Sequence, residues 1–256
     1  MLMIMGFGMR GDLWRPQIEG ITGHQLAWFD NRGIGESEPG PKRLWTMKDM
    51  ARDALRVMDA LGWDDAHLVG VSMGGMIAQE CALLAESRFR SLTLIATHEG
   101  GGISWLPSFE GLKAWLEVNL APESERFAAL ERLLYPEAWL RTADREALRA
   151  RMQAQIGRRA QRGTLLGQLH AVMRHDTGDR LRSLRLPTLI IKPCLDVLIP
   201  PERSERLRRR IAHAKLLEIP DAGHGAVFQS KDVINAALIE HFADAEMAAK
   251  PPTVHA

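Results

Sequence analysis

Between residues 66 and 84 the chain reads AHLVGVSMGGMIAQECALL. The first apolar run is typical of a buried strand, and the last has the spacing of a buried helix. The turn between them is Gly70-Val71-Ser72-Met73-Gly74-Gly75. Glycines two residues before and two residues after Ser72 permit a strand-to-helix turn that is too tight for larger side chains. The pattern predicts that the Ser72 hydroxyl stands at the end of a strand, where it can act as a nucleophile.

The same turn places the Met73 amide at the start of a helix. Unpaired N–H groups and the positive end of the helix dipole favour a negatively charged oxygen at that point. A glycine-rich bend, Gly6-Phe7-Gly8, ends the apolar run at the start of the chain and places a second backbone N–H within reach of the same site. A chance match to the serine pattern is the alternative, and the strand and helix patterns on either side count against it.

The composition is that of an ordinary globular protein. The 256 residues are 46% hydrophobic and 25% charged, enough for one large α/β domain or two small ones. A formal net charge of +1 gives no indication of nucleic acid or an anionic membrane as a partner. Cys81 and Cys194 belong to no metal-binding or disulfide pattern, which favours a reducing, cytoplasmic compartment. No stretch has the pattern of a targeting or membrane-spanning segment.

Strand and helix patterns alternate along most of the chain. This alternation predicts right-handed strand-helix-strand units and a mostly parallel sheet, which binds its ligands at the carboxyl ends of the strands. The expected strands are residues 1–5, 24–29, 66–69, 91–97, 187–191 and 215–219.

The alternation stops between about residues 103 and 186. Helices are expected there at residues 112–120, 124–134, 143–162 and 164–174. We therefore predict a core of residues 1–98 and 187–256 and an all-helical cap of residues 99–186. Such a cap would cover the catalytic edge and shape a mainly apolar pocket, although most of its aromatic side chains are expected to pack the helices together. The last helix is expected at residues 230–242, followed by a disordered tail.

A serine hydroxyl needs a base, which is usually a histidine oriented by a carboxylate. Asp196 and His224 follow two successive predicted strands, in the order serine, acid, histidine. Of nine histidines, His224 is favoured because Gly223 and Gly225 leave its loop free to reach over the sheet edge. Glu99, just after an earlier strand, is an alternative acid.

These residues resemble the α/β hydrolase superfamily, and within it small cofactor-free esterases, 3-oxoadipate enol-lactonase-like proteins and haloperoxidase-like perhydrolases. The resemblance rests on residues 29–96, on the bend at Phe7 and on Asp221-Ala222-Gly223-His224-Gly225. It includes Asp30-Asn31-Arg32-Gly33-Ile34-Gly35-Glu36-Ser37, which is similar to the family's DxRGxGxS turn. The resemblance implies that Asp30 and Arg32 are structural.

The resemblance also implies a role for each candidate site residue. Ser72 would be the nucleophile, Asp196 the orienting acid and His224 the base, and the Phe7 and Met73 amides would form the oxyanion hole. No metal or cofactor is implied.

Three departures from the family are visible. Met5-Gly6 stands where the family commonly has His-Gly, and Pro193-Cys194-Leu195-Asp196 replaces its GxxD. The family's N-terminal strand hairpin is expected to be missing.

The leading function is a serine hydrolase that cleaves a carboxylic ester or lactone of modest size and hydrophobic character through an acyl-enzyme. The alternatives are a C–C bond hydrolase or perhydrolase with the same three residues, and a hydrolase-like ligand-binding protein. Because the turn carries serine and not aspartate, haloalkane dehalogenase and epoxide hydrolase chemistry is not expected. The oligomeric state stays open.

Overall fold

The structure is a computed structural model that describes residues 1–41, 44–156 and 160–249. Six strands form one sheet in the order β2-β1-β3-β4-β5-β6, and every neighbouring pair is parallel. The predicted α/β fold with a mostly parallel sheet is therefore confirmed. The strands are β1 (Leu2–Ile4), β2 (Ala27–Phe29), β3 (Ala66–Val71), β4 (Phe89–Ile95), β5 (Thr188–Pro193) and β6 (Lys215–Ile219).

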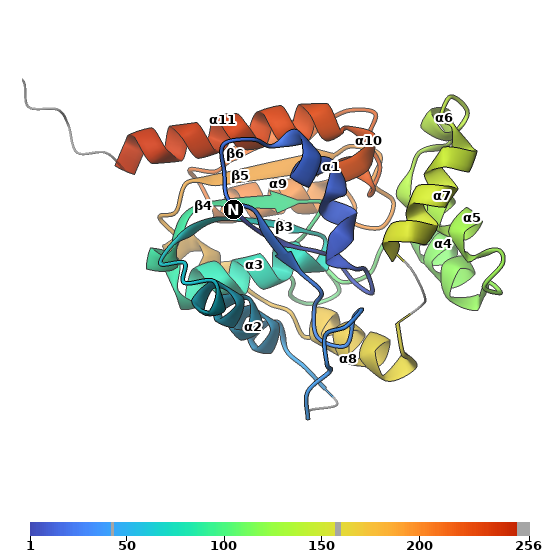
Figure 1. Ribbon diagram of the computed structural model, residues 1–256, viewed down its shortest axis with the longest axis horizontal. Helices are drawn as coiled ribbons and strands as arrows, with labels where there is room; N and C mark the ends of the chain where they lie inside the picture. Colours follow the sequence, from blue (N-terminus) through green and yellow to red (C-terminus); the bar gives the residue numbers. More distant parts are fainter. Residues whose placement is uncertain (42–43, 157–159, 250–256) are drawn as a thin grey trace, which may run out of the picture.

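Helices cover both faces of the sheet (Figure 1). The long helix α11 (Lys231–Ala249) and the short α1 (Arg15–Gly20) lie on one face, and α2 (Met47–Ala60), α3 (Met73–Leu84) and α9 (Glu202–Arg210) lie on the other. Each face has its own hydrophobic cluster, and alternate residues of β1 and β3 enter the two clusters. Strands buried on both faces read as continuous apolar runs, which explains the pattern at residues 1–5 and 66–71.

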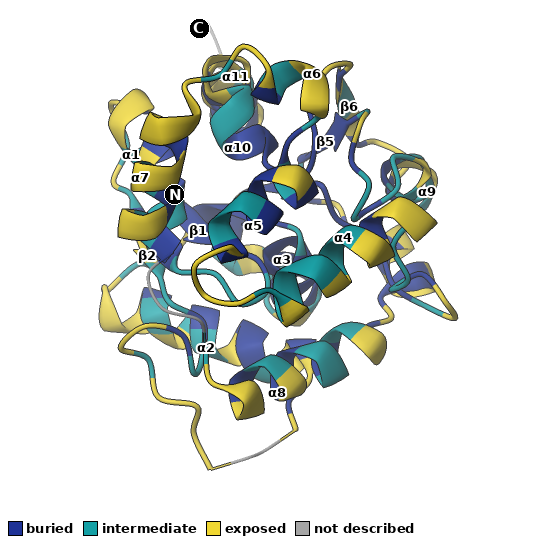
Figure 2. Ribbon diagram, turned by 90° about the vertical axis from the view of Figure 1, so that its right-hand side faces the viewer, coloured by how far each residue is buried: buried dark blue, intermediate teal, exposed yellow. Residues whose placement is uncertain are grey.

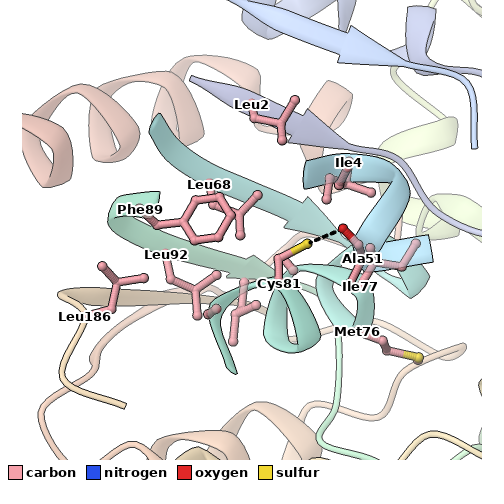
Figure 3. Close-up of a cluster of buried hydrophobic side chains, with 14 of the residues drawn as sticks. Leu2, Ile4, Ala51, Leu68, Met76, Ile77, Cys81, Phe89, Leu92 and Leu186 are labelled. Carbon is pink, nitrogen blue, oxygen red and sulfur yellow. Dashed lines mark hydrogen bonds between the residues drawn. The ribbon is translucent and has the colours of Figure 1, made fainter. Parts of the chain in front are cut away.

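Figure 3 shows the cluster between the sheet and α3. Leu68 and Leu92 of the sheet pack against Ile77 and Cys81 of α3, and none of these four side chains is exposed. The Cys81 thiol donates to the Ala51 carbonyl of α2 at 3.6 Å. Helix α3, which follows directly after Ser72, is thus anchored on both sides, and this anchoring holds the serine turn in place.

The chain between β4 and β5 is helical, as predicted. Its helices are α4 (Phe109–Leu120), α5 (Arg126–Leu134), α6 (Glu137–Leu140), α7 (Arg145–Ile156) and α8 (Arg162–Met173). Figure 1 shows α4 to α7 grouped at one end of the sheet, with α8 beside α2. Figure 2 views the molecule from that end and shows exposed residues alternating with buried ones along α8. The division into a core and a cap of residues 99–186 remains a prediction.

Helices α5 and α7 are joined by a buried acid. Glu131 of α5 is fully buried and pairs with Arg145 and Arg149 of α7, each at 2.6 Å. Leu130, Leu148 and Met152 form a small separate hydrophobic cluster between these helices. The helix expected at residues 143–162 is interrupted, because α7 ends at Ile156 and α8 begins at Arg162; residues 157–159 of that prediction lie outside the described residues.

The prediction of a disordered tail after Ala243 is wrong as far as residue 249, because α11 continues to Ala249. Side-chain contacts tie its last turns to the sheet. Asp244 pairs with Lys215 of β6 at 2.6 Å, and Glu246 lies 3.3 Å from Nε2 of His67 on β3. Residues 250–256 of the predicted tail lie outside the described residues. None of the helices in the described ranges combines the length and apolar character that crossing a bilayer requires.

Candidate active site

Ser72 has a backbone conformation that few L-residues adopt. Its φ is 55° and its ψ is −125°, and it is one of two non-glycine residues with positive φ in the described part of the chain. Such a conformation costs on the order of 1–3 kcal/mol and persists only where the surroundings enforce it. The Ser72 N–H donates to the Ile95 carbonyl at 2.9 Å, and the Thr97 hydroxyl donates to the Ser72 carbonyl at 2.7 Å. Strand β4 and the residues directly after it therefore hold the strained turn on both sides of the serine.

The glycines around Ser72 are required by close approaches of the backbone. A Cβ on Gly70 would lie 2.3 Å from the Gly74 oxygen, and a Cβ on Gly74 would lie 2.0 Å from the Ile4 oxygen. A Cβ on Gly6 would lie 3.1 Å from Cβ of Ser72. The bend after β1 thus passes directly beside the serine, at the carboxyl ends of both strands.

The loops after β5 and β6 bring Asp196 and His224 together. Nδ1 of His224 lies 2.7 Å from Oδ2 of Asp196, and the Asp196 side chain is fully buried. Its other oxygen, Oδ1, accepts hydrogen bonds from the Leu198 and Ile199 amides at 2.8 and 2.9 Å. These bonds to Oδ1 leave Oδ2 for His224, so the imidazole donates through Nδ1–H and its Nε2 is the atom without a proton.

Ser72 and His224 line the same cavity. Among the described residues, no hydrogen bond joins the Ser72 hydroxyl to His224. Contacts between a nucleophile and its base are often loose without substrate and shorten in the complex. The structure thus brings the acid to the histidine, and places the histidine and the serine on one cavity wall.

The predicted oxyanion amides, Phe7 and Met73, also line the cavity. Met73 is the first residue of α3, and no hydrogen bond within the described ranges uses the N–H of Phe7 or Met73. The bend that carries Phe7 is held at both ends. The Asn31 side chain donates to the Met5 carbonyl, and the Gly8 N–H donates to Oε1 of Gln168, both at 2.8 Å.

Sequence reasoning did not single out Gln168. It lies on α8, 160 positions after Gly8, and no local pattern connects the two. Asn31 lies within the stretch that resembles the family turn, so a signal for it was present. Its hydrogen bond to the Met5 carbonyl stabilises the segment Met5-Gly6, which stands where the family commonly has His-Gly.

The other candidates have structural partners. The alternative acid, Glu99, is 1% exposed and pairs with Arg206 at 2.7 Å, not with His224. Asp30 accepts from the Gly11 amide at 2.7 Å, and Arg32 pairs with Asp53 at 2.7 Å. Both of these contacts agree with structural roles for the family turn.

His98 also lines the cavity, and its surroundings keep it neutral. Burial, with smaller effects from Arg203 and Arg206, lowers the pKa of His98 to about 3. Its Nδ1 accepts a hydrogen bond from the Gly100 amide at 2.9 Å. No carboxylate in the described structure accompanies this histidine as Asp196 accompanies His224, so His224 is the better placed base.

The cavity has a volume of about 370 Å³ and a mainly apolar lining. The residues around Ser72 form part of this lining, and the helical chain between β4 and β5 contributes Trp105, Trp115, Leu130, Leu133, Leu165 and Val172. Two arginines, Arg126 and Arg151, also line it, and no sequence pattern singled out either of them. A small organic molecule fits a site of this size and character.

One cluster in the described structure has the residue types and spacing for a metal ion. It consists of His24, His67 and Glu246, whose ligand atoms lie within 4.8 Å of one another. His67 is near the start of β3, at the opposite end of that strand from Ser72. Glu246 already contacts His67 and lies 3.5 Å from Arg90, so the cluster is satisfied without an ion.

Known proteins are similar to this chain in sequence and in fold. A family model for the alpha/beta hydrolase fold matches residues 1–231. A protein of Azorhizobium caulinodans that carries the name carbamate hydrolase RutD is 32% identical, over 93% of this chain and 89% of its own. An esterase from Thermogutta terrifontis is 26% identical, with a TM-score of 0.78 over 95% of this chain and 89% of its own. An enol-lactonase from Burkholderia xenovorans shares the fold at 20% identity, with a TM-score of 0.80 over 94% and 90% of the two chains. This chain belongs to the alpha/beta hydrolase fold family and is a hydrolase.

Proposed function

We propose that the chain is a serine hydrolase that cleaves a carboxylic ester or lactone through an acyl-enzyme on Ser72. The observation that carries this proposal is the 2.7 Å hydrogen bond from His224 to the buried Asp196, on the wall of the cavity that also contains the strained Ser72. An imidazole oriented in this way presents a basic Nε2 to the cavity. The similarity of the whole chain to the Thermogutta esterase also supports ester hydrolysis.

The proposed reaction uses these residues in turn. His224 takes the Ser72 proton as Oγ bonds to the substrate carbonyl carbon, and the carbonyl oxygen becomes anionic. The Phe7 and Met73 amides donate to that oxygen. The bond to the leaving oxygen then breaks, and His224 returns the proton to it; in a lactone this oxygen stays attached to the acyl group. Water, deprotonated by His224, releases the acid and restores Ser72.

Carbamate hydrolysis is a second candidate. It is favoured by the name of the Azorhizobium relative, to which this chain is 32% identical. A carbamate offers the same carbonyl to Ser72, and the group released from it differs. C–C bond hydrolysis and perhydrolysis would use the same residues, but no contact in the described cavity favours them over ester cleavage.

The test is reaction of the purified protein with a fluorophosphonate probe, followed by mass analysis of the labelled peptide. We expect labelling at Ser72 that disappears in Ser72→Ala. A folded protein that stays unlabelled would contradict the proposal and favour a hydrolase-like protein that binds a ligand with little turnover. A labelled protein is then offered pairs of esters, lactones and carbamates of equal size, which separates the two candidate substrate classes.

A further inference from the structure

Arg151 is a cation in the wall of an apolar cavity. It lies on α7, it is only partly exposed, and its side chain lines the same cavity as Ser72 and His224. Burial is the largest effect on this group and lowers the pKa of Arg151 from its ordinary value. A guanidinium stays charged even so, and a charge removed from water needs a compensating partner.

The partners of Arg151 in the described structure are all neutral. Nη1 donates to Oε1 of Gln155 at 2.8 Å, and Nη2 donates to the Tyr135 hydroxyl at 3.1 Å. The guanidinium carbon lies 3.4 Å from the ring centroid of Phe228, and Nε is buried with no hydrogen-bond partner. No aspartate or glutamate of the described ranges forms an ion pair with Arg151, and residues 42–43, 157–159 and 250–256 contain neither acid.

The cavity itself has an unbalanced charge. Two of its described lining residues are arginines, and none is an aspartate or glutamate. The second arginine, Arg126, is 4% exposed and pairs with Glu123 at 3.2 Å. Arg151 also borders a neighbouring cavity that contains Glu19 and Asp232, but Glu19 lies 4.0 Å from Arg15 and neither acid pairs with Arg151. Among the described residues that line the cavity, Arg151 is therefore the charged side chain without a carboxylate partner, in surroundings of low polarity where electrostatic attraction is strong.

Arg151 is also close to the catalytic loop. The Tyr135 ring, whose hydroxyl accepts from Arg151, packs so tightly on the loop that a Cβ on Gly225 would lie 2.4 Å from it. The Gly225 amide also donates to the Leu134 carbonyl at 2.8 Å. A single aromatic ring thus separates the guanidinium from the residue that follows His224. Arg151 and His224 both line the cavity, so a compact molecule bound there can contact both side chains at once.

We propose that Arg151 binds a carboxylate of the substrate, so that the natural substrate is an ester, lactone or carbamate that carries a second, ionised carboxyl group. The planar fork of an arginine matches a carboxylate, and Nη1 and Nη2 each keep one N–H beyond the bonds to Gln155 and Tyr135. This inference rests on the proposed function for the identity of the bond that is cleaved, the ester, lactone or carbamate bond. It replaces the expectation of a purely hydrophobic substrate with that of an apolar chain ending in an acid.

The probes are methyl ketones, which hold a carbonyl for the Ser72 site and are not hydrolysed. Each oxo acid from 4-oxopentanoate to 7-oxooctanoate is paired with its own amide, which has nearly the same shape and no charge. Binding is followed by the fluorescence of Trp105 and Trp115, which line the cavity, and by calorimetry. We expect the best acid to bind about 10- to 100-fold more tightly than its amide, as charge-assisted hydrogen bonds give.

Variants assign this preference to Arg151. In Arg151→Met the ratio of the two affinities should fall towards 1, and Arg151→Lys, which keeps the charge but not the fork, should lie between. Arg141→Met is the matched control, because Arg141 is an exposed cap arginine paired with Glu137 and does not line the cavity. Thermal unfolding checks that each variant is folded. If Arg151→Met does not fold, Arg151→Lys still tests the inference.

An amide that binds the wild-type protein as tightly as its acid would overturn the inference, and so would a preference that survives in folded Arg151→Met. Neither binding result depends on turnover. Fluorophosphonate labelling of the same samples reports on Ser72 separately. A protein that is labelled but shows no preference for acids keeps the proposed function and loses this inference, and an unlabelled protein that prefers acids does the reverse.

Discussion

Replacing Asp196 by asparagine should move the ring proton of His224 from Nδ1 to Nε2 while the side chains stay in place. Oδ1 of Asp196 accepts two backbone N–H bonds, from Leu198 and Ile199. An amide NH₂ in that position would face two donors, so the side-chain oxygen of the new asparagine stays there and its NH₂ group turns to Nδ1 of His224. Nδ1 must then accept, which moves the ring proton to Nε2, the atom that has to take the proton of Ser72.

The size of the effect follows from what is lost. The imidazolium that forms during acylation loses a buried, charge-assisted hydrogen bond of 2.7 Å, worth about 1.5–3 kcal/mol. The neutral ring must also leave its preferred tautomer. The same change in a serine protease triad slows turnover about 10⁴-fold. We expect a decrease of about 10³- to 10⁴-fold here, which corresponds to about 4–5.5 kcal/mol at 1.36 kcal/mol for each factor of ten.

The assay is the second-order rate constant for fluorophosphonate labelling of Ser72, measured at pH 7 by mass spectrometry. Asp221→Asn is the matched control, because the Asp221 side chain is exposed three residues before His224. Glu99→Gln tests the alternative acid and should leave labelling of the folded fraction within a few fold of wild type, because Glu99 pairs with Arg206. A decrease of less than tenfold in Asp196→Asn, or a larger decrease in Glu99→Gln, would refute the reasoning.

Three further outcomes follow from other contacts. Gln168→Leu removes the acceptor of the Gly8 amide. In steady-state kinetics of ester hydrolysis this change should lower kcat about tenfold while KM changes little. An effect on KM alone would contradict a role of Gln168 in holding the Phe7 bend. Gly225→Ala puts a Cβ 2.4 Å from the Tyr135 ring and should lower the free energy of unfolding by about 1–3 kcal/mol in urea titrations, whereas an unchanged midpoint would show that the ring moves freely. Folding lowers the pKa of His98 from 6.5 to about 3, so as the pH falls the unfolded chain takes up this proton before the folded protein does. The contribution of His98 to the free energy of unfolding is complete above about pH 6.5, and that free energy should fall by about 2 kcal/mol between pH 7 and pH 5. His98→Gln should remove this part of the pH dependence.

The sequence was sufficient for the features that depend on local pattern. The apolar runs predicted all six strands, and the glycines at positions 70 and 74 predicted a turn whose close backbone approaches the structure shows. The proximity of Asp196 to His224 was predictable for a different reason. Both residues follow neighbouring parallel strands, and the carboxyl ends of such strands meet at one edge.

Contacts between distant segments were not predictable in this way. Gln168 reaches Gly8 only because α8 packs beside the bend after β1, and the last turns of α11 contact the sheet through an ion pair with Lys215 of β6 and a hydrogen bond with His67 of β3. Helix periodicity says which face of a helix is apolar, but not which neighbour that face meets. In the helices between β4 and β5, a polar residue is interpreted from the sequence pattern alone as a solvated side chain, and so Arg151 was not singled out.

The position of Arg151 also bears on how this cavity would select among substrates. An apolar wall discriminates weakly, because one extra methylene changes binding by about 1–3 kcal/mol. A buried guanidinium discriminates strongly against molecules that leave it unpaired, because its desolvation is compensated only when an anion arrives. The Phe228 ring and the Tyr135 hydroxyl hold Arg151 in place before any ligand binds. A neutral ester would therefore have to fill the cavity against an unpaired charge, while an acid of the same shape would neutralise it. On this reasoning the preference for an acid should grow only slightly as salt is lowered, because a buried pair is screened far less than an exposed one; a steep salt dependence would place the binding charge on the surface instead.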